Sequence, residues 1–126
     1  MLPITKGHPP VVLEAVARAG CEAIGENRVG EAEAKLADVG RLGVRWHMIG
    51  HLQRNKAGRA IRAFDVIESV DSVRLARRLH LEAEKAERVD VPILVQVNAG
   101  GEQQKSGLEP AELVDAVGAM LDLGRV

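Results

Sequence analysis

The stretch VRWHMIGHLQRNK, residues 44–56, shows the unit from which the chain is built. Its first half, Val44 to Gly50, is a nearly continuous apolar run that ends at a glycine. A helical pattern follows, and its apolar residues at i, i+3, i+4 and i+7 are Ala57, Ala60, Ile61 and Phe64. Such spacing places four side chains on one face of a helix. The stretch therefore predicts a buried strand, a turn and an amphipathic helix.

Four other apolar runs repeat this unit at nearly constant spacing. They are Leu2 to Lys6, Ala23 to Asn27, Val66 to Asp71 and Val91 to Asn98. The runs are continuous instead of alternating, which is typical of parallel strands buried on both faces. Between the runs, helical spacing places Val12, Ala15, Val16 and Ala19 on one apolar face. In the last predicted helix, Pro110 suits the first turn, and the buried side consists of Leu113, Val117 and Met120. The sequence thus predicts five βα units.

Five βα units fit two architectures: a complete doubly wound sheet of the flavodoxin type, or five-eighths of a (β/α)8 barrel. A complete barrel needs about 200 residues or more, so a length of 126 residues by itself favours the doubly wound sheet. Both architectures bind ligands at the carboxyl ends of their strands. The candidate site residues are therefore Lys6, Glu26, Asn27, Gly50, Asp71 and Asn98.

The composition limits the function. Apolar residues make up 46% of the chain, enough for the core of one domain, and a net charge of −1 provides no basic field for nucleic acid or an anionic membrane. Trp46 and Phe64 are the only aromatic residues, which nearly excludes base stacking. The single cysteine, Cys21, and the absence of a signal-like or spanning segment in MLPITKGHPP predict a cytoplasmic location.

Lys6 is the residue best suited to covalent chemistry. It closes the first predicted strand, where we expect its amine to lose hydration, and desolvation exposes the neutral nucleophile of a lysine. A lysine of this kind suits a Schiff base with an aldehyde cofactor. An ordinary rim lysine fits the same position, and spacing alone does not decide between the two.

The other polar positions have ordinary interpretations beside functional ones. Asn27 can cap the next helix or offer its amide to a ligand. His47 and His51 lack a cysteine or carboxylate at ligand spacing, so we expect no metal site. A basic run on one helix indicates a solvated face; its members are Arg54, Lys56, Arg59 and Arg62. The glycines at 100 and 101 do not form a phosphate loop, because the order of Gly, Lys and Ser is wrong.

Taken together, five motifs in order resemble the pyridoxal-phosphate homeostasis proteins, whose barrel is of the alanine racemase N-terminal type. The motifs are Thr5-Lys6, Gly25-Glu26-Asn27, WHMIGHLQRNK at 46–56, Ser69-Val70-Asp71, and Val97-Asn98 through Lys105-Ser106-Gly107. They cover almost the whole chain, and the eleven-residue motif is highly specific. The resemblance implies an incomplete TIM-type (β/α)8 barrel of about five βα units, with residues 1–126 as a single partial domain that binds pyridoxal 5′-phosphate (PLP).

The resemblance also implies the roles of particular residues. Lys6 would be the Schiff-base lysine, and Asn27, His47 and Gly50 would lie near the cofactor. Such proteins buffer PLP or transfer it, without expected substrate turnover, and PLP-accepting apoenzymes are possible partners. No catalytic residue is expected. Lys105, in a glycine-rich loop, is the alternative amine.

The sequence departs from the family pattern in one large respect. Strands six to eight, and a helix expected before the first strand, have no counterpart, so we expect a truncated product and weak phosphate binding. Two other functions stay open. A racemase-type PLP enzyme needs a second acid/base group, usually a tyrosine, and this sequence has no Tyr. A fragment without cofactor function is the second alternative.

Overall fold

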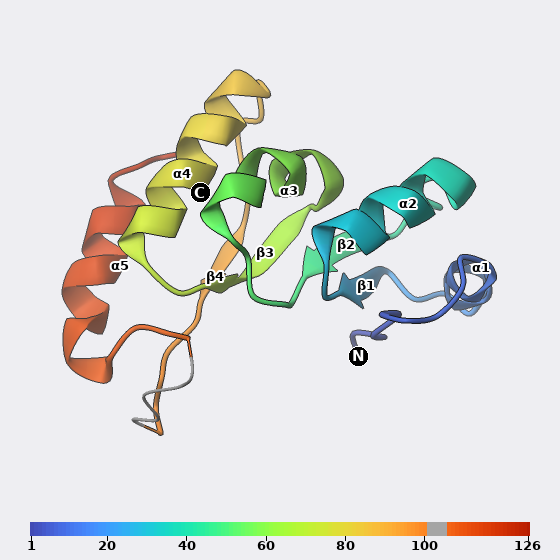
Figure 1. Ribbon diagram of the computed structural model, residues 1–126, viewed down its shortest axis with the longest axis horizontal. Helices are drawn as coiled ribbons and strands as arrows, with labels where there is room; N and C mark the ends of the chain where they lie inside the picture. The colour runs from blue at the N-terminus through green and yellow to red at the C-terminus, as the bar shows by residue number, and fades with distance from the viewer. Residues whose placement is uncertain (101–105) are drawn as a thin grey trace.

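The computed structural model describes residues 1–100 and 106–126. Helices and strands alternate along the chain, and helices cover one side of the sheet (Figure 1). In chain order the elements are α1 Val11–Arg18, β1 Ala23–Glu26, α2 Val29–Val39, β2 Arg45–Met48, η1 Arg54–Lys56, α3 Ala57–Ala63, β3 Val66–Val70, α4 Val73–Lys85, β4 Ile93–Val95, η2 Pro110–Glu112 and α5 Leu113–Leu121, where η marks a 3-10 helix. In the described ranges, no helix is both long and apolar enough to cross a membrane.

The four strands form one parallel sheet in the order β1-β2-β3-β4. A doubly wound sheet would carry later strands on both sides of the first, as in the order 2-1-3-4-5. Here each strand pairs with the one before it, as in a barrel. The fold implied by the resemblance is therefore confirmed, and the chain forms a partial α/β barrel. The doubly wound sheet that length alone favoured is wrong.

The first predicted strand, Leu2 to Lys6, is reduced to a single bridge between Ile4 and Gly25. The Gly25 amide donates to the Pro3 carbonyl at 2.8 Å, and the Thr5 amide donates to the Gly25 carbonyl at 3.0 Å. Pairing stops there because Pro3 has no N–H to donate and a turn begins at Thr5. In the described residues the sheet thus has four strands, and the N-terminal segment extends it by one residue beside β1.

The core lies between the sheet and its helices. Trp46 and Met48 of β2 and Ile67 of β3 are almost completely buried there. The buried residues of α3 and α4 include Ala57, Ala60, Ile61, Leu75, Ala76 and Leu79. The apolar stripe predicted for residues 57–64 is therefore confirmed, and it continues the same hydrophobic cluster.

The stripe predicted for the first helix is wrong in phase. The buried residue of α1 is Leu13, with Val16 and Ala17 packed against the core, whereas Ala15 and Ala19 are exposed. In Figure 1, α1 lies at one end of the molecule, beyond β1. A helix at the end of the layer buries a narrower face than one between two neighbours, so its apolar residues do not all point inward.

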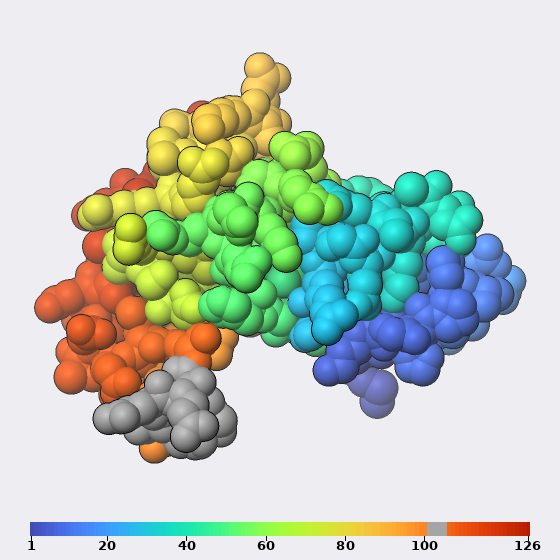
Figure 2. Space-filling model, in the orientation of Figure 1, coloured from blue at the N-terminus to red at the C-terminus, as the bar shows by residue number. Residues whose placement is uncertain are grey.

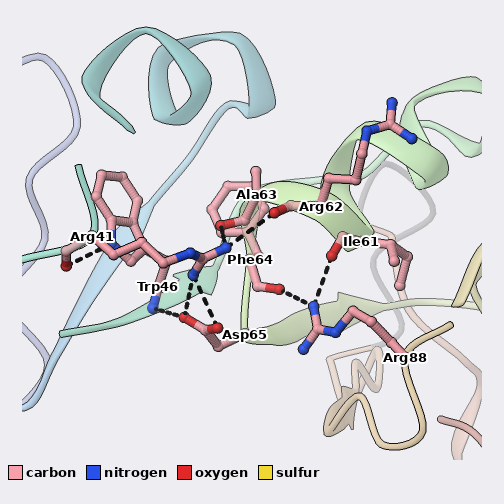
Figure 3. Close-up of polar contacts among 8 residues, drawn as sticks. All are labelled: Arg41, Trp46, Ile61, Arg62, Ala63, Phe64, Asp65 and Arg88. Atoms are coloured by element: carbon pink, nitrogen blue, oxygen red, sulfur yellow. Dashed lines mark hydrogen bonds and ion pairs between the residues drawn. The ribbon is translucent and has the colours of Figure 1, made fainter. Parts of the chain in front are cut away.

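Two arginines hold the carbonyl groups at the carboxyl end of α3 (Figure 3). Arg88 Nη1 donates to the carbonyl oxygens of Ile61 at 2.7 Å and Phe64 at 2.6 Å. Arg41 Nη2 donates to the carbonyl oxygen of Arg62 at 3.0 Å. The last carbonyls of a helix have no hydrogen-bond donor within the helix. The two arginine side chains supply donors to these carbonyl groups. They fix α3 at the amino ends of the strands.

Candidate functional site

Lys6 lies on a tight turn directly after the bridge to β1. The His8 amide donates to the Thr5 carbonyl at 3.1 Å and closes the turn, and Gly7 has a φ of 71°. A positive φ at the third position of a turn is typical of type II and favours glycine. Lys6 itself is exposed, so the loss of hydration expected for its amine is wrong. The turn presents the amine to solvent from a fixed backbone.

Thr5 is anchored by a buried ion pair between β1 and α2. Lys35 Nζ lies 2.6 Å from Glu26 Oε1 and donates to the Thr5 carbonyl at 2.7 Å. Thr5 Oγ1 donates to the same Glu26 oxygen at 2.5 Å. Glu26, expected at the ligand face, therefore points into the helix layer instead. The parity of the strand explains this, because Glu26 shares a face with the buried Ile24.

Asn27 and Gly50, at the ends of β1 and β2, are in close contact. A Cβ built on Gly50 would lie 2.1 Å from the backbone oxygen and 2.7 Å from Oδ1 of Asn27. The N-cap of α2 is Arg28, with no side-chain capping bond. The interpretation of Asn27 as a helix cap is therefore wrong, and its amide lies over the end of the sheet.

Asn27 borders three hollows at this end of the sheet; one, of about 510 Å³, lies toward α2 and η1 and includes Lys56 in its lining, and the other two reach Lys6 and the segment after β4. A smaller one, of about 370 Å³, is lined by Lys6, Gly7, Asn27, Arg28 and Glu31. A larger one, of about 550 Å³, extends to the segment after β4 and is lined by Asn27, Ile49, Gly50, His51, Gln96, Val97, Asn98, Ala99, Gly100 and Ser106. Figure 2 shows the surface indented between the blue N-terminal segment and the orange residues near the end of β4. All three volumes fall within the usual range for small-molecule sites.

Other predicted polar residues lie around the larger hollow. His51 Nδ1 is 3.4 Å from Asp71 Oδ2 and 3.3 Å from Ser106 Oγ. Asn98 is buried, and its Nδ2 donates to Glu109 Oε1 at 3.3 Å. These contacts hold the ends of β3 and β4 near that of β2. In the described residues, no group of three or more His, Cys, Asp or Glu side chains could hold a metal ion.

His47 lies apart from these hollows. Its neighbours Trp46 and Met48 are buried beneath the helices, so His47 is on the other face of the sheet. There its Nδ1 lies 2.5 Å from Oε1 of Glu68 on β3, and Nε2 is buried without a hydrogen-bond partner among the described residues. This is the face that a closed barrel would turn inward.

The basic run on η1 and α3 is a solvated face, as predicted. Its four members, Arg54, Lys56, Arg59 and Arg62, are exposed. Arg59 forms an ion pair with Glu33 of α2. The hydrogen bond from Arg59 lowers the pKa of Glu33 and raises that of Arg59. Both groups are largely in solvent, where such pairs stabilise proteins little.

Lys35, a buried residue of α2 that contacts Thr5, is not among the residues predicted from the sequence. One signal was available: Lys35 falls at helical spacing from Val29 and Ala32, on the side of α2 that is otherwise apolar. A lysine at such a position needs a buried partner. Lys105, the alternative amine, and Gly101 lie outside the described residues.

The fold and these contacts define a class: a partial α/β barrel with polar groups gathered at the carboxyl ends of its strands. The family model described as "Alanine racemase, N-terminal domain" matches residues 5–126. The chain belongs to this family.

Curated relatives with the same name, pyridoxal phosphate homeostasis protein, make the comparison more specific. The chain is 38% identical over 126 residues to the pyridoxal phosphate homeostasis protein of Mycobacterium tuberculosis (strain ATCC 25618 / H37Rv). This alignment covers 86% of the present chain and 48% of the M. tuberculosis protein. The chain is 33% identical over 129 residues to the Escherichia coli (strain K12) protein of the same name, at 100% and 55% coverage. The resemblance to these proteins is therefore confirmed. The chain spans about half the length of the curated relatives it matches.

Solved structures agree with this assignment. PipY of Synechococcus elongatus PCC7942, determined without PLP, superposes with a TM-score of 0.92 and 37% identity, over 99% of this chain and 58% of PipY. The structure of PipY with PLP bound gives a TM-score of 0.87 at 36% identity, with 97% and 56% coverage. An alanine racemase of Clostridium difficile 630 gives 0.76 at 15% identity, which shows a common fold.

Proposed function

We propose that this chain binds pyridoxal 5′-phosphate through Lys6 and serves PLP homeostasis by buffering or transferring the cofactor. The observation that carries the proposal is the exposed Lys6 on a hydrogen-bonded turn, beside a hollow that it shares with Asn27. PLP supplies an aldehyde, which condenses with a lysine amine and releases water. The PLP-bound structure of PipY, a relative with 36% identity, supports the assignment.

The residues at this end of the sheet fit such a cofactor. Lys6 would provide the attachment, and the Asn27 amide would hydrogen-bond polar atoms of the ring. Gly50 would leave room for Asn27, because any side chain there would displace it. His47 would act from the barrel face, with its Nδ1 held by Glu68 and its Nε2 without a partner in the part of the chain that the structure describes. Donors and acceptors arranged around an apolar sheet end are typical of cofactor sites.

The proposal assigns binding to this chain, and no catalytic turnover. The relatives are named for homeostasis, and no tyrosine occurs in the sequence to supply a racemase-type acid/base group. Release of a reversibly bound aldehyde would let PLP-accepting apoenzymes act as recipients. A cytoplasmic location, expected from the single cysteine, is part of the same proposal.

Reconstitution with PLP tests the attachment. We expect the visible absorption band of lysine-bound PLP, and after borohydride reduction peptide mapping should find the label on Lys6. Lys6→Ala should abolish that label. Lys56→Ala is the matched control, because Lys56 is another exposed lysine that lines a hollow with Asn27. Label confined to lysines other than Lys6, or unchanged labelling of the Lys6→Ala protein, would refute the proposal.

A further inference from the structure

We infer that Lys35 and Glu26 are positioning residues for Lys6, which they control through Thr5. The inference rests on the proposed attachment of the cofactor at Lys6. The side chains of Lys35 and Glu26 are 7% and 0% exposed. Burying an ion pair costs free energy that its own attraction often fails to recover, so such pairs are a weak source of stability. Lys35 and Glu26 both contact Thr5, the residue before the attachment lysine, and this position points to a role in orienting Lys6.

The pair contacts Thr5 at both its main chain and its side chain. Lys35 Nζ bridges Glu26 Oε1 and the Thr5 carbonyl, at 2.6 and 2.7 Å. Thr5 Oγ1 donates to Glu26 Oε1 at 2.5 Å. Thr5 is only 2% exposed, so water does not compete for these bonds. Each bond has a charged partner, which makes it stronger than a neutral one.

The anchored carbonyl also belongs to the turn that carries Lys6. It accepts from the His8 amide at 3.1 Å, while the Thr5 amide donates to the Gly25 carbonyl at 3.0 Å. The amide, carbonyl and hydroxyl of Thr5 are therefore all held, and the chain leaves Thr5 in one direction. Fixing the backbone next to a reactive side chain reduces the freedom that is lost on binding. The side chain of Lys6, which lines the hollow bounded by Asn27, therefore starts from a fixed backbone position.

Two substitutions of Thr5 separate orientation from stability. Thr5→Val keeps the shape of the side chain and removes the hydroxyl, whereas Thr5→Ser keeps the hydroxyl and removes a buried methyl. The readout is the ratio of PLP trapped by borohydride on Lys6 to that on Lys85, an exposed lysine on α4. The same samples provide the thermal midpoint and the circular dichroism spectrum. Lys35→Met, with the same readouts, tests the other end of the network.

We expect Thr5→Val and Lys35→Met to lower the Lys6 to Lys85 ratio by about tenfold, the effect of losing one hydrogen bond to a charged group. Thr5→Ser should keep the ratio within about twofold of the wild type although its thermal midpoint falls. A purely structural role predicts instead that the ratio follows the midpoint in all three variants, and that result overturns the inference. If the wild type is labelled preferentially on Lys6 and the Lys6 to Lys85 ratio is unchanged in folded Thr5→Val or Lys35→Met protein, the inference is overturned while the proposed function stands. No preference for Lys6 in the wild type overturns both.

Discussion

At the scale of single residues, the contact between Gly50 and Asn27 decides how the site is shaped. The two residues end neighbouring strands, and their backbones approach so closely that a Cβ on Gly50 would lie 2.1 Å from the Asn27 oxygen. Backbone cannot move aside as a flexible side chain can. Glycine is therefore required here for close approach, and the direction of the Asn27 amide depends on it.

Gly50→Ala should lower the free energy of unfolding by about 1–3 kcal/mol, the usual cost of overpacking. It should also weaken PLP labelling of Lys6, because Asn27 must shift. The matched control is Gly118→Ala in α5, where an added Cβ meets no atom of the described residues within 4 Å. That control should raise the free energy of unfolding by about 0.5–1 kcal/mol through helix propensity. Urea unfolding measures both, and equal stabilities for the two variants would contradict the argument.

The sequence predicted some of these residues and not others. Lys6, Asn27 and Gly50 follow from their places at strand ends, because any parallel sheet exposes those positions. The Lys35–Glu26 pair could not be predicted in the same way. The pair depends on which face of β1 packs against α2. The four residues of β1 are buried almost throughout, so polar and apolar residues do not alternate in a way that would identify this face from the sequence.

At the scale of elements, pairing partners explain where the predictions failed. The first apolar run, Leu2 to Lys6, has a neighbour on one side only and forms a single bridge. The helix at the same end of the molecule, α1, has its apolar residues out of the predicted phase. By contrast α3 contacts both α2 and α4, and its predicted stripe is buried. Hydrophobic periodicity is reliable where an element is covered on both sides.

The carboxyl end of α3 offers a test at this scale. Arg88→Ala should lower the free energy of unfolding by about 2 kcal/mol, because the carbonyls of Ile61 and Phe64 lose a charged donor in a partly buried place. Arg62→Ala, on the same helix and exposed, should change it by about 0.5 kcal/mol or less. Chemical denaturation of the two proteins makes the comparison. If both variants lose the same small amount, the arginine clamp does not hold the helix.

At the scale of the whole molecule, the strand order separates the two folds that the sequence left open. Both a doubly wound sheet and a barrel bury their strands on two faces, so the apolar runs of either read alike. Length favoured the wrong one. What identified the barrel was the set of motifs at the strand ends, such as WHMIGHLQRNK at 46–56, because site residues are specific to a family whereas core residues are interchangeable.

The distribution of charge over the molecule predicts how it distinguishes PLP from pyridoxal, which lacks the phosphate. Barrels commonly hold phosphate at the loops after strands seven and eight, and the sheet described here has four strands. The larger hollow beside Asn27 is lined by amide, hydroxyl, imidazole and small side chains, with no lysine or arginine among its described lining residues. A phosphate needs fixed donors, and each hydrogen bond to a charged group contributes about 1.5–3 kcal/mol.

We therefore expect the dissociation constants of this chain for PLP and pyridoxal to differ by about tenfold or less. Titration of the visible absorption band with each aldehyde measures both constants on the same protein. Arg28→Ala is a useful companion, because Arg28 lines the smaller hollow with Lys6 and is the arginine best placed to reach a phosphate there. If Arg28 supplied such a contact, the substitution would weaken PLP and leave pyridoxal unchanged. A preference for PLP of about a thousandfold, equivalent to about 4 kcal/mol, would mean that residues 1–126 contain a phosphate site of their own. The amine of Lys6 would then be the lesser part of the binding free energy, and the chain would select its cofactor by charge before it reacts with the aldehyde.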